Sequence, residues 1–156
     1  MEQDHHIIPA ELWGAREGGD YFIPELYNMK SAHRFSFDCE ANHVIQEYHN
    51  GSHPDYTKAV GSRIEALISL DKSGTKFDGG IFVDQLISLT RRLKIFLLSL
   101  ENGGYSSLDE AISSDGNEVE FKMALNGTRS EPYQTKSAPY DTYTRSGQTK
   151  YPPCGT

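Results

Sequence analysis

The C-terminal end of this 156-residue chain contains none of the side chains that build a hydrophobic core. From Thr128 to Thr156 there is no Leu, Ile, Val, Phe, Met or Trp, and Thr, Tyr, Pro and Ser are frequent. Folding is driven chiefly by burial of apolar side chains, so this segment cannot form a core of its own. We therefore expect a single domain over residues 1–127, followed by a polar, Tyr-rich tail over 128–156 that is flexible or surface-bound.

Two kinds of hydrophobic periodicity occur within residues 1–127, and together they predict an α+β fold. Apolar side chains recur at helical spacing in three segments, which lie at about 56–68, 80–101 and 108–112. Apolar and polar residues alternate, as in strands, in three short segments, which are "HHIIP" near the N-terminus, "RFSFD" at 34–38 and "EVEFKMA" at about 118–124. Repeated Gly and Pro residues between about 10 and 33 predict a long irregular connection.

Acidic residues are concentrated in the first part of the chain. The net charge is −7, and residues 1–65 hold 11 acidic and 5 basic side chains, against 11 and 10 in residues 66–156. Affinity for nucleic acid comes largely from Lys and Arg, which argues against binding through bulk charge alone. No apolar run approaches the ~20 residues that span a bilayer, and the N-terminus lacks the features of a secretory signal. We expect no membrane insertion.

All six histidines lie in the N-terminal part of the chain, and four of them form two close pairs. His5 and His6 are adjacent in an expected strand, and His49 and His53 are four residues apart where a helix is expected to begin. Neutral imidazoles bind zinc and related metals, and two of them at this spacing can converge on one ion. Adjacent strand residues point to opposite faces, so His5 and His6 suit two different roles. His43 has no such pairing, and surface polarity explains it best.

Three motifs, in this order, carry a resemblance to a known family. "DHHIIP" comes first, an asparagine within "FSFDCEANHVI" follows, and "HNGSHPDY" then opens an amphipathic helix. The order resembles the HNH/endonuclease VII superfamily, and within it the AHH group of bacterial polymorphic-toxin nucleases, which have HH-[LIV]-[LIV]-P and H-x-G-x-H-P-x-Y motifs. The resemblance covers about residues 4–68. It implies a ββα-metal (His-Me) finger core. The periodicity described above adds helices over about 78–113 and a strand near 118–124.

The resemblance also implies a role for each histidine of the motifs. His6 would be the general base that takes a proton from water, and Asn42 would hold this base in position. His5, His49 and His53 would bind one divalent metal ion, which is zinc, nickel or magnesium. Such an ion would neutralise charge on the scissile phosphate and on the leaving oxygen.

The first motif departs from the family pattern at one position. Asp4 stands where the family has alanine, and its carboxylate is an alternative to His5 as metal ligand, one that would favour magnesium. Local acidity raises the electrostatic cost of binding a phosphodiester, so basic side chains are expected in the cleft. We expect Arg34 and Lys58 to contact the substrate phosphate, with surface solubility as the alternative explanation for both.

The activity implied by the resemblance is metal-dependent endonucleolytic hydrolysis of phosphodiester bonds, with DNA favoured over RNA as substrate. The chain would be the toxic effector domain of a bacterial competition system, secreted within a larger effector or delivered by contact. It would act in the cytoplasm of the target cell and be neutralised by a cognate immunity protein. The alternative is a non-catalytic binding module in which the histidines hold a structural zinc. A purely structural site does not need the adjacent second histidine, His6.

Overall fold

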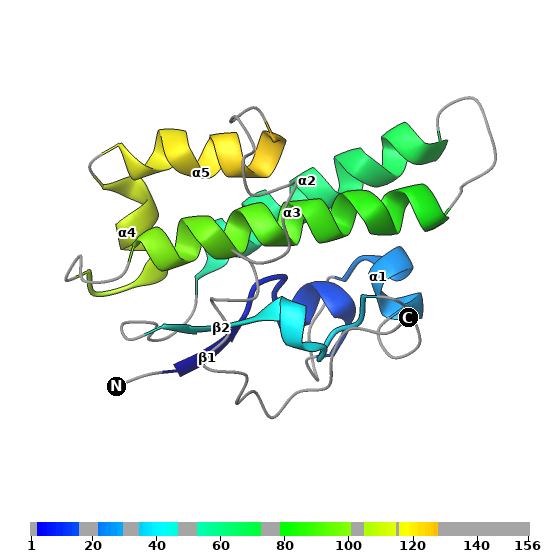
Figure 1. Cartoon of the computed structure of the whole chain (residues 1–156), viewed down its shortest axis with the longest axis horizontal. Coiled ribbons are helices and arrows are strands. Elements are labelled where there is room, and N and C mark those ends of the chain that lie inside the picture. The colour runs from blue at the N-terminus through cyan, green and yellow to red at the C-terminus, as the bar shows by residue number, and fades with distance from the viewer. Residues whose placement is uncertain are drawn as a thin grey trace.

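A computed structural model of the chain describes residues 3–15, 22–29, 35–46, 53–72, 79–100, 105–114 and 116–127. This part is mostly helical with a two-stranded antiparallel sheet, which is compatible with the α+β class. The sheet and the short N-terminal helices form one layer, and the long helices form the other (Figure 1). In chain order the elements are β1 (Gln3–His6), η1 (Ala10–Trp13), α1 (Pro24–Asn28), η2 (Glu40–Asn42), β2 (His43–Gln46), α2 (Pro54–Lys72), α3 (Gly79–Ser99), α4 (Leu108–Ser113) and α5 (Asn117–Asn126).

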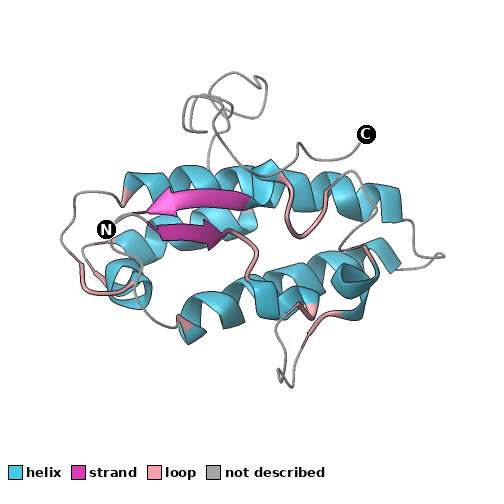
Figure 2. Ribbon diagram, turned by 90° about the horizontal axis from the view of Figure 1, so that it is seen from below, coloured by secondary structure: helices cyan, strands magenta, loops and turns pink. Residues whose placement is uncertain are grey.

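β1 and β2 form a short antiparallel sheet in which the two strands lie side by side (Figure 2). The register places His5 opposite Val44 and His6 opposite His43. Side chains alternate between the two faces of a strand, so His6 and His43 share one face while His5 lies on the other. A two-stranded sheet is only marginally stable alone, and this one depends on the helices packed against it.

The two long helices pack through apolar stripes and confirm the helices predicted from periodicity. On α2, Tyr56, Val60 and Ile64 recur every four residues, and each is fully buried. α4 likewise confirms the helical turns predicted near residue 108. Among the described side chains of α3, the buried apolar ones are Phe82, Val83, Leu86, Leu89, Leu93, Phe96 and Leu97.

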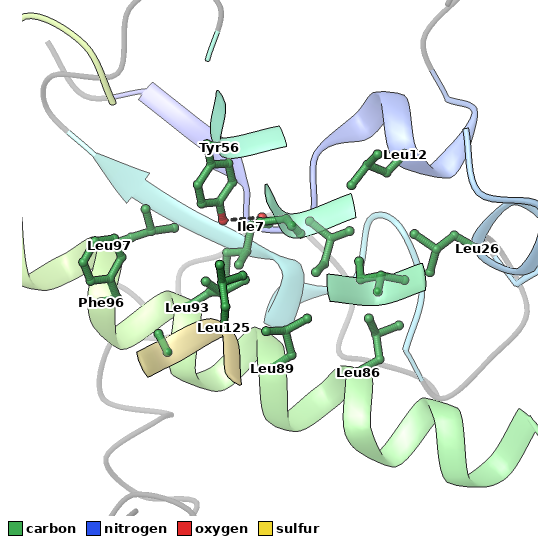
Figure 3. Close-up of a cluster of buried hydrophobic side chains, with 14 of the residues drawn as sticks. Ile7, Leu12, Leu26, Tyr56, Leu86, Leu89, Leu93, Phe96, Leu97 and Leu125 are labelled. Atoms are coloured by element: carbon green, nitrogen blue, oxygen red, sulfur yellow. Dashed lines mark hydrogen bonds between the residues drawn. The ribbon is translucent and has the colours of Figure 1, made fainter. Parts of the chain in front are cut away.

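A single apolar cluster joins the two layers. Leu12 from η1 and Leu26 from α1 lie in the same cluster as Leu86 and Leu89 of α3, with Leu125 of α5 in the same close-up (Figure 3). Burying one such side chain contributes about 1.5–3 kcal/mol relative to leaving it exposed. The C-terminal helices therefore stabilise the N-terminal layer that carries the histidines.

The strand predicted at 118–124 is wrong, because these residues lie within helix α5. Phe121, Ala124 and Leu125 are buried at helical spacing, and the ring of Phe121 lies 5.6 Å from that of Tyr56. Arg92 of α3 donates through Nε to the Ala124 carbonyl oxygen at 2.6 Å and through Nη2 to that of Leu125 at 3.4 Å. The helix ends at a glycine with φ of 69°. Packing on α3 and capping of the last carbonyls thus outweigh the local alternation.

The strand predicted at 34–38 is also wrong for the described residues of that segment. Phe35 is fully buried and Phe37 partly so, and their rings lie 5.9 and 6.1 Å from that of Trp13. Both aromatic side chains therefore pack around Trp13, and the backbone turns into η2 instead of pairing with β1. The partner of β1 is the following segment, β2. Arg34 and the tail over 128–156 lie outside the described residues.

Candidate active site

The two adjacent histidines of β1 lie in different surroundings, as strand alternation predicts. His5 is buried, at 3% exposure, and its ring centroid lies 4.9 Å from that of His53 in an edge-on arrangement. His6 is partly exposed and lies on the other face of the sheet. The two-stranded sheet therefore separates two imidazole groups: His5 with His53 on the side of α2, and His6 on the other side.

The residue that precedes α2, His53, is held by the first turn of this helix. Its Nδ1 lies 3.2 Å from the Thr57 hydroxyl oxygen, and its carbonyl oxygen accepts the Thr57 N–H at 3.1 Å. Burial lowers the pKa of His53 below its ordinary value, against smaller raising effects that include the charges of Asp109 and Glu11. The ring is therefore neutral at neutral pH, which is the form that binds metals.

The start of α2 is held by a carboxylate from another helix. Asp109 of α4 accepts the backbone N–H of Asp55 through Oδ2 at 3.0 Å and that of Tyr56 through Oδ1 at 3.1 Å. The first N–H groups of a helix have no partner within it, so a carboxylate placed there stabilises both the helix and its orientation. Sequence reasoning missed Asp109, because it lies 54 and 53 residues along the chain from the two N–H groups that it accepts and no local signal marks it.

Tyr56 ties the first turn of α2 to the end of β1. Its hydroxyl donates to the carbonyl oxygen of Ile7 at 2.6 Å, and this hydrogen bond is drawn in Figure 3. Complete burial raises the pKa of Tyr56 far above its ordinary value, so the phenol stays protonated and remains a donor. Its ring lies 5.8 Å from that of His5 and 5.5 Å from that of His53. Tyr56 thus fixes the spacing of these two imidazoles.

The side chain of Asn42 is fully buried and cross-links the segments on either side of the site. Its Oδ1 accepts the Ile8 N–H at 2.8 Å, and its Nδ2 donates to the carbonyl oxygens of Phe37 at 2.9 Å and Ile8 at 3.3 Å. Its backbone oxygen accepts the Ile7 N–H at 2.8 Å. Asn42 therefore fixes the chain immediately after His6.

The face of the sheet opposite His5 carries a second group, formed by His6, His43 and Asp38. His6 Nε2 lies 3.0 Å and His43 Nε2 lies 3.1 Å from the same carboxylate oxygen, Oδ1 of Asp38. The two imidazole rings are 4.4 Å apart, and Phe37 stacks on the His6 ring at 4.3 Å. His43 is only 6% exposed, so the interpretation of it as a surface polar residue is wrong. Sequence reasoning also missed Asp38, which the turn before η2 brings to the histidines.

The remaining predicted site residues are placed only in part. Lys58 is exposed on α2 and lines a pocket of about 230 Å³ together with Glu11, Pro54, Thr57 and Ser62. Because Thr57 also contacts His53, this pocket adjoins the first imidazole group. Asp4 belongs to β1, but its side chain lies outside the described part, as do His49 and Arg34.

Both imidazole groups offer donors that fit a divalent metal ion. On the α2 side, the buried Nε2 of His5 and the neutral ring of His53 are nitrogen donors. On the other side, the donor atoms of His6, Asp38 and His43 all lie within 4.8 Å of one another. Nitrogen donors suit zinc and nickel, and an added carboxylate widens the choice to magnesium.

Comparison with known proteins identifies one family. The model of the AHH family, described as a nuclease family of the HNH/ENDO VII superfamily with conserved AHH, matches residues 1–79. The match includes β1, β2 and α2, and with them every residue of the two imidazole groups. Asp4 takes the place of the alanine for which the family is named. No curated protein and no solved structure matches the chain. None of the described helices is long and apolar enough to cross a membrane.

Proposed function

Because the chain belongs to the AHH family of nucleases in the HNH/ENDO VII superfamily, we propose that it is a metal-dependent endonuclease that hydrolyses phosphodiester bonds in DNA. We propose further that β1, β2 and α2 are its ββα-metal finger. The observation that carries this proposal is the division of labour in β1, where His5 faces the start of α2 and His6 faces the opposite side. A metal ligand and a base can thereby be adjacent in sequence without competing for one position.

The metal ligands in this proposal lie where β1 meets α2. His5 and His53 supply two nitrogen donors, and His49 supplies the third, with Asp4 as the alternative to His5. The Nδ1 of His53 lies within hydrogen-bond distance of the Thr57 hydroxyl, and in this proposal its Nε2 binds the ion. A bound divalent ion would supply charge stabilisation to the scissile phosphate and the leaving oxygen.

The hydrolytic chemistry in this proposal falls to His6. As general base it takes a proton from water, whose oxygen then attacks phosphorus. Asn42 holds the chain after His6 through its hydrogen bonds to Ile8 and Phe37 and so keeps the base in place. Lys58, at the pocket beside Thr57, and Arg34 contribute positive charge for the substrate phosphates.

We assign the protein to bacterial competition, as a toxic effector domain that acts in the cytoplasm of a target cell and is neutralised by a cognate immunity protein. The family motifs support this assignment. Induced synthesis of the chain in the cytoplasm of a test bacterium is expected to stop growth and degrade DNA. The His6→Ala variant, produced at the same level, is expected to permit growth. Equal toxicity of the two would contradict the assignment.

Cleavage of supercoiled plasmid by the purified chain tests the proposed activity. Wild type is incubated with EDTA, magnesium, zinc or nickel, beside His6→Ala, His53→Ala and the control His33→Ala, which alters a histidine outside both pairs. We expect His6→Ala to lose cleavage while it keeps its bound metal, because His6 is not a ligand. We expect His53→Ala to lose metal and cleavage together, and His33→Ala to retain both.

The same experiment separates the rival functions. Normal cleavage by His6→Ala would show that the base is another residue. Cleavage of RNA but not DNA in a parallel reaction would correct the substrate. Tight zinc binding without cleavage of either nucleic acid would favour the structural zinc module in place of the nuclease site.

A further inference from the structure

The acidic side chain between His6 and His43 has no role in the function proposed above. Asp38 is 56% exposed, yet its Oδ1 is within hydrogen-bond distance of both imidazoles, at 3.0 Å from His6 Nε2 and 3.1 Å from His43 Nε2. Partial burial raises its pKa, but the hydrogen bonds and charges of the two histidines outweigh this effect and lower the pKa below its ordinary value. Asp38 is therefore a carboxylate at neutral pH, and both histidines donate N–H groups to it.

The geometry around His6 constrains both its ring and its proton. The Nε2–H of His6 is directed at the carboxylate, so the basic lone pair of the neutral ring is on Nδ1. Phe37 stacks on the ring with an interplanar angle of 5°, which fixes the plane of the imidazole. His43, paired opposite His6 in the sheet, donates to the same oxygen of the carboxylate.

We infer that Asp38 is a positioning residue for the base: it holds the tautomer of His6 in which Nδ1 accepts the proton of the attacking water, and it stabilises the imidazolium that results. This inference rests on the proposed function. In the step, one proton moves from water to Nδ1 while the water oxygen bonds to phosphorus. The bond from phosphorus to the leaving oxygen breaks, and that oxygen takes a proton from solvent. Asp38 keeps its charge throughout.

The same three residues also have the composition of a metal site, since their donor atoms lie within 4.8 Å of one another. Two features favour positioning. Both Nε2 atoms are at hydrogen-bond distance from a single oxygen, as two donors sharing one acceptor would be. The His5 and His53 pair offers nitrogen donors to an ion on the other face of the sheet, and a base coordinated through its own ring would be weakened.

The test is the Asp38→Asn variant of the full chain, assayed for kcat, KM and bound metal. Asparagine keeps the size of the side chain but removes its charge, and its amide can donate to one histidine and force the wrong tautomer. Replacing the buried aspartate of a serine protease triad in this way lowers kcat by about 10⁴-fold. Because Asp38 is half exposed to water, we expect a smaller loss in kcat, of about 10²-fold, with KM within about threefold and metal content unchanged.

Two further variants make the result specific. Asp38→Glu restores the carboxylate and is expected to recover at least about tenfold of the loss, since charge and not shape is the missing element. Asp84→Asn makes the same change at an exposed position of α3 and is expected to leave kcat unchanged.

Each other outcome overturns the inference. Unchanged kcat in Asp38→Asn would show that the carboxylate does not act through His6. Loss of bound metal together with activity would assign the three residues to a metal site instead. A wild-type chain that cleaves no nucleic acid, or a His6→Ala variant with full activity, would refute the proposed function itself, and these results are read from separate reactions.

Discussion

Replacement of Asn42 by alanine removes the side chain that joins η2 to the segment after β1. Three hydrogen bonds are lost, from Ile8 N–H to Oδ1 and from Nδ2 to the carbonyl oxygens of Phe37 and Ile8. They are not equivalent. The Ile8 carbonyl oxygen keeps a second donor, Trp13 Nε1 at 3.1 Å, and the contact with the Phe37 oxygen is only partly buried, so water can replace it.

The largest loss comes from the Ile8 N–H, which is left buried without an acceptor. An unsatisfied buried donor costs about 1–3 kcal/mol, and each ordinary hydrogen bond contributes about 0.5–1.5 kcal/mol. Because Trp13 Nε1 still donates to the Ile8 carbonyl oxygen, that oxygen adds little to the loss. We expect Asn42→Ala to lower the free energy of unfolding by about 3 kcal/mol. For a chain of this length that lowers Tm by about 6–12 °C. Asn42→Asp is expected to lose a similar amount, because a second carboxylate oxygen would face two carbonyl oxygens.

Urea unfolding in EDTA measures this loss without a contribution from metal binding, which would stabilise the folded state by linkage. Asn126→Ala, which truncates an exposed asparagine at the end of α5, is the control and should change stability by less than about 0.5 kcal/mol. If Asn42→Ala is as stable as the control, the hydrogen bonds of this side chain do not hold the chain after His6, and the role assigned to Asn42 is wrong.

Three further predictions concern the helices. Asp109→Ala removes the acceptor of two N–H groups at the start of α2, so it should lower the free energy of unfolding in urea by about 1–2 kcal/mol and weaken metal binding. An unchanged affinity for the metal would show that the cap does not position the site. Gly127→Ala places a Cβ 3.2 Å from the Arg92 guanidinium carbon at a φ of 69°, so it should destabilise the chain by about 1–2 kcal/mol; a stabilising effect would refute that geometry. Hydrogen bonds from the backbone and hydroxyl of Ser106 lower the pKa of Glu110, so its carboxylate stabilises α4 at pH values above the ordinary pKa, and this stabilisation is lost as the pH falls through the lowered pKa. Glu110→Gln should therefore reduce the loss of stability at acidic pH. An unchanged loss in this variant would contradict the prediction.

Long periodic segments were predictable from sequence, whereas two of the short ones, at 34–38 and 118–124, were assigned wrongly. Both α2 and α3 repeat their apolar pattern over several turns, so the helical period is unambiguous. The segment that forms α5 fits two periods, since Val119, Phe121 and Met123 alternate as in a strand while Phe121, Ala124 and Leu125 follow a helix. Contacts with α3 decide between them, and Val119 is left 60% exposed. Such tertiary contacts are not visible in a local pattern.

In the candidate site, too, features set by local geometry were predictable from sequence, and contacts between distant residues were not. The motif predicted that His5 and His6 would lie on opposite faces, because strand alternation follows from local geometry. The carboxylates of Asp38 and Asp109 were not predicted. Asp38 reaches His6 across 32 positions of the sequence, and Asp109 reaches Tyr56 across 53. Asp38 stands in the "FSFDCEANHVI" motif at a position with no assigned role, and Asp109 lies outside every motif, so only the folded chain reveals what each contacts.

The cap that Asp109 provides to α2 bears on how this family can diversify by recombination. The family match ends at residue 79, whereas the carboxylate that holds the start of α2 comes from α4. An exchange of C-terminal segments between members of the family would therefore preserve every motif histidine and still misplace His53, unless the incoming segment supplies an acceptor at the same point. Active chimeras should therefore be limited to those whose new C-terminal segment both packs in the hydrophobic core and supplies an acceptor for the first N–H groups of α2.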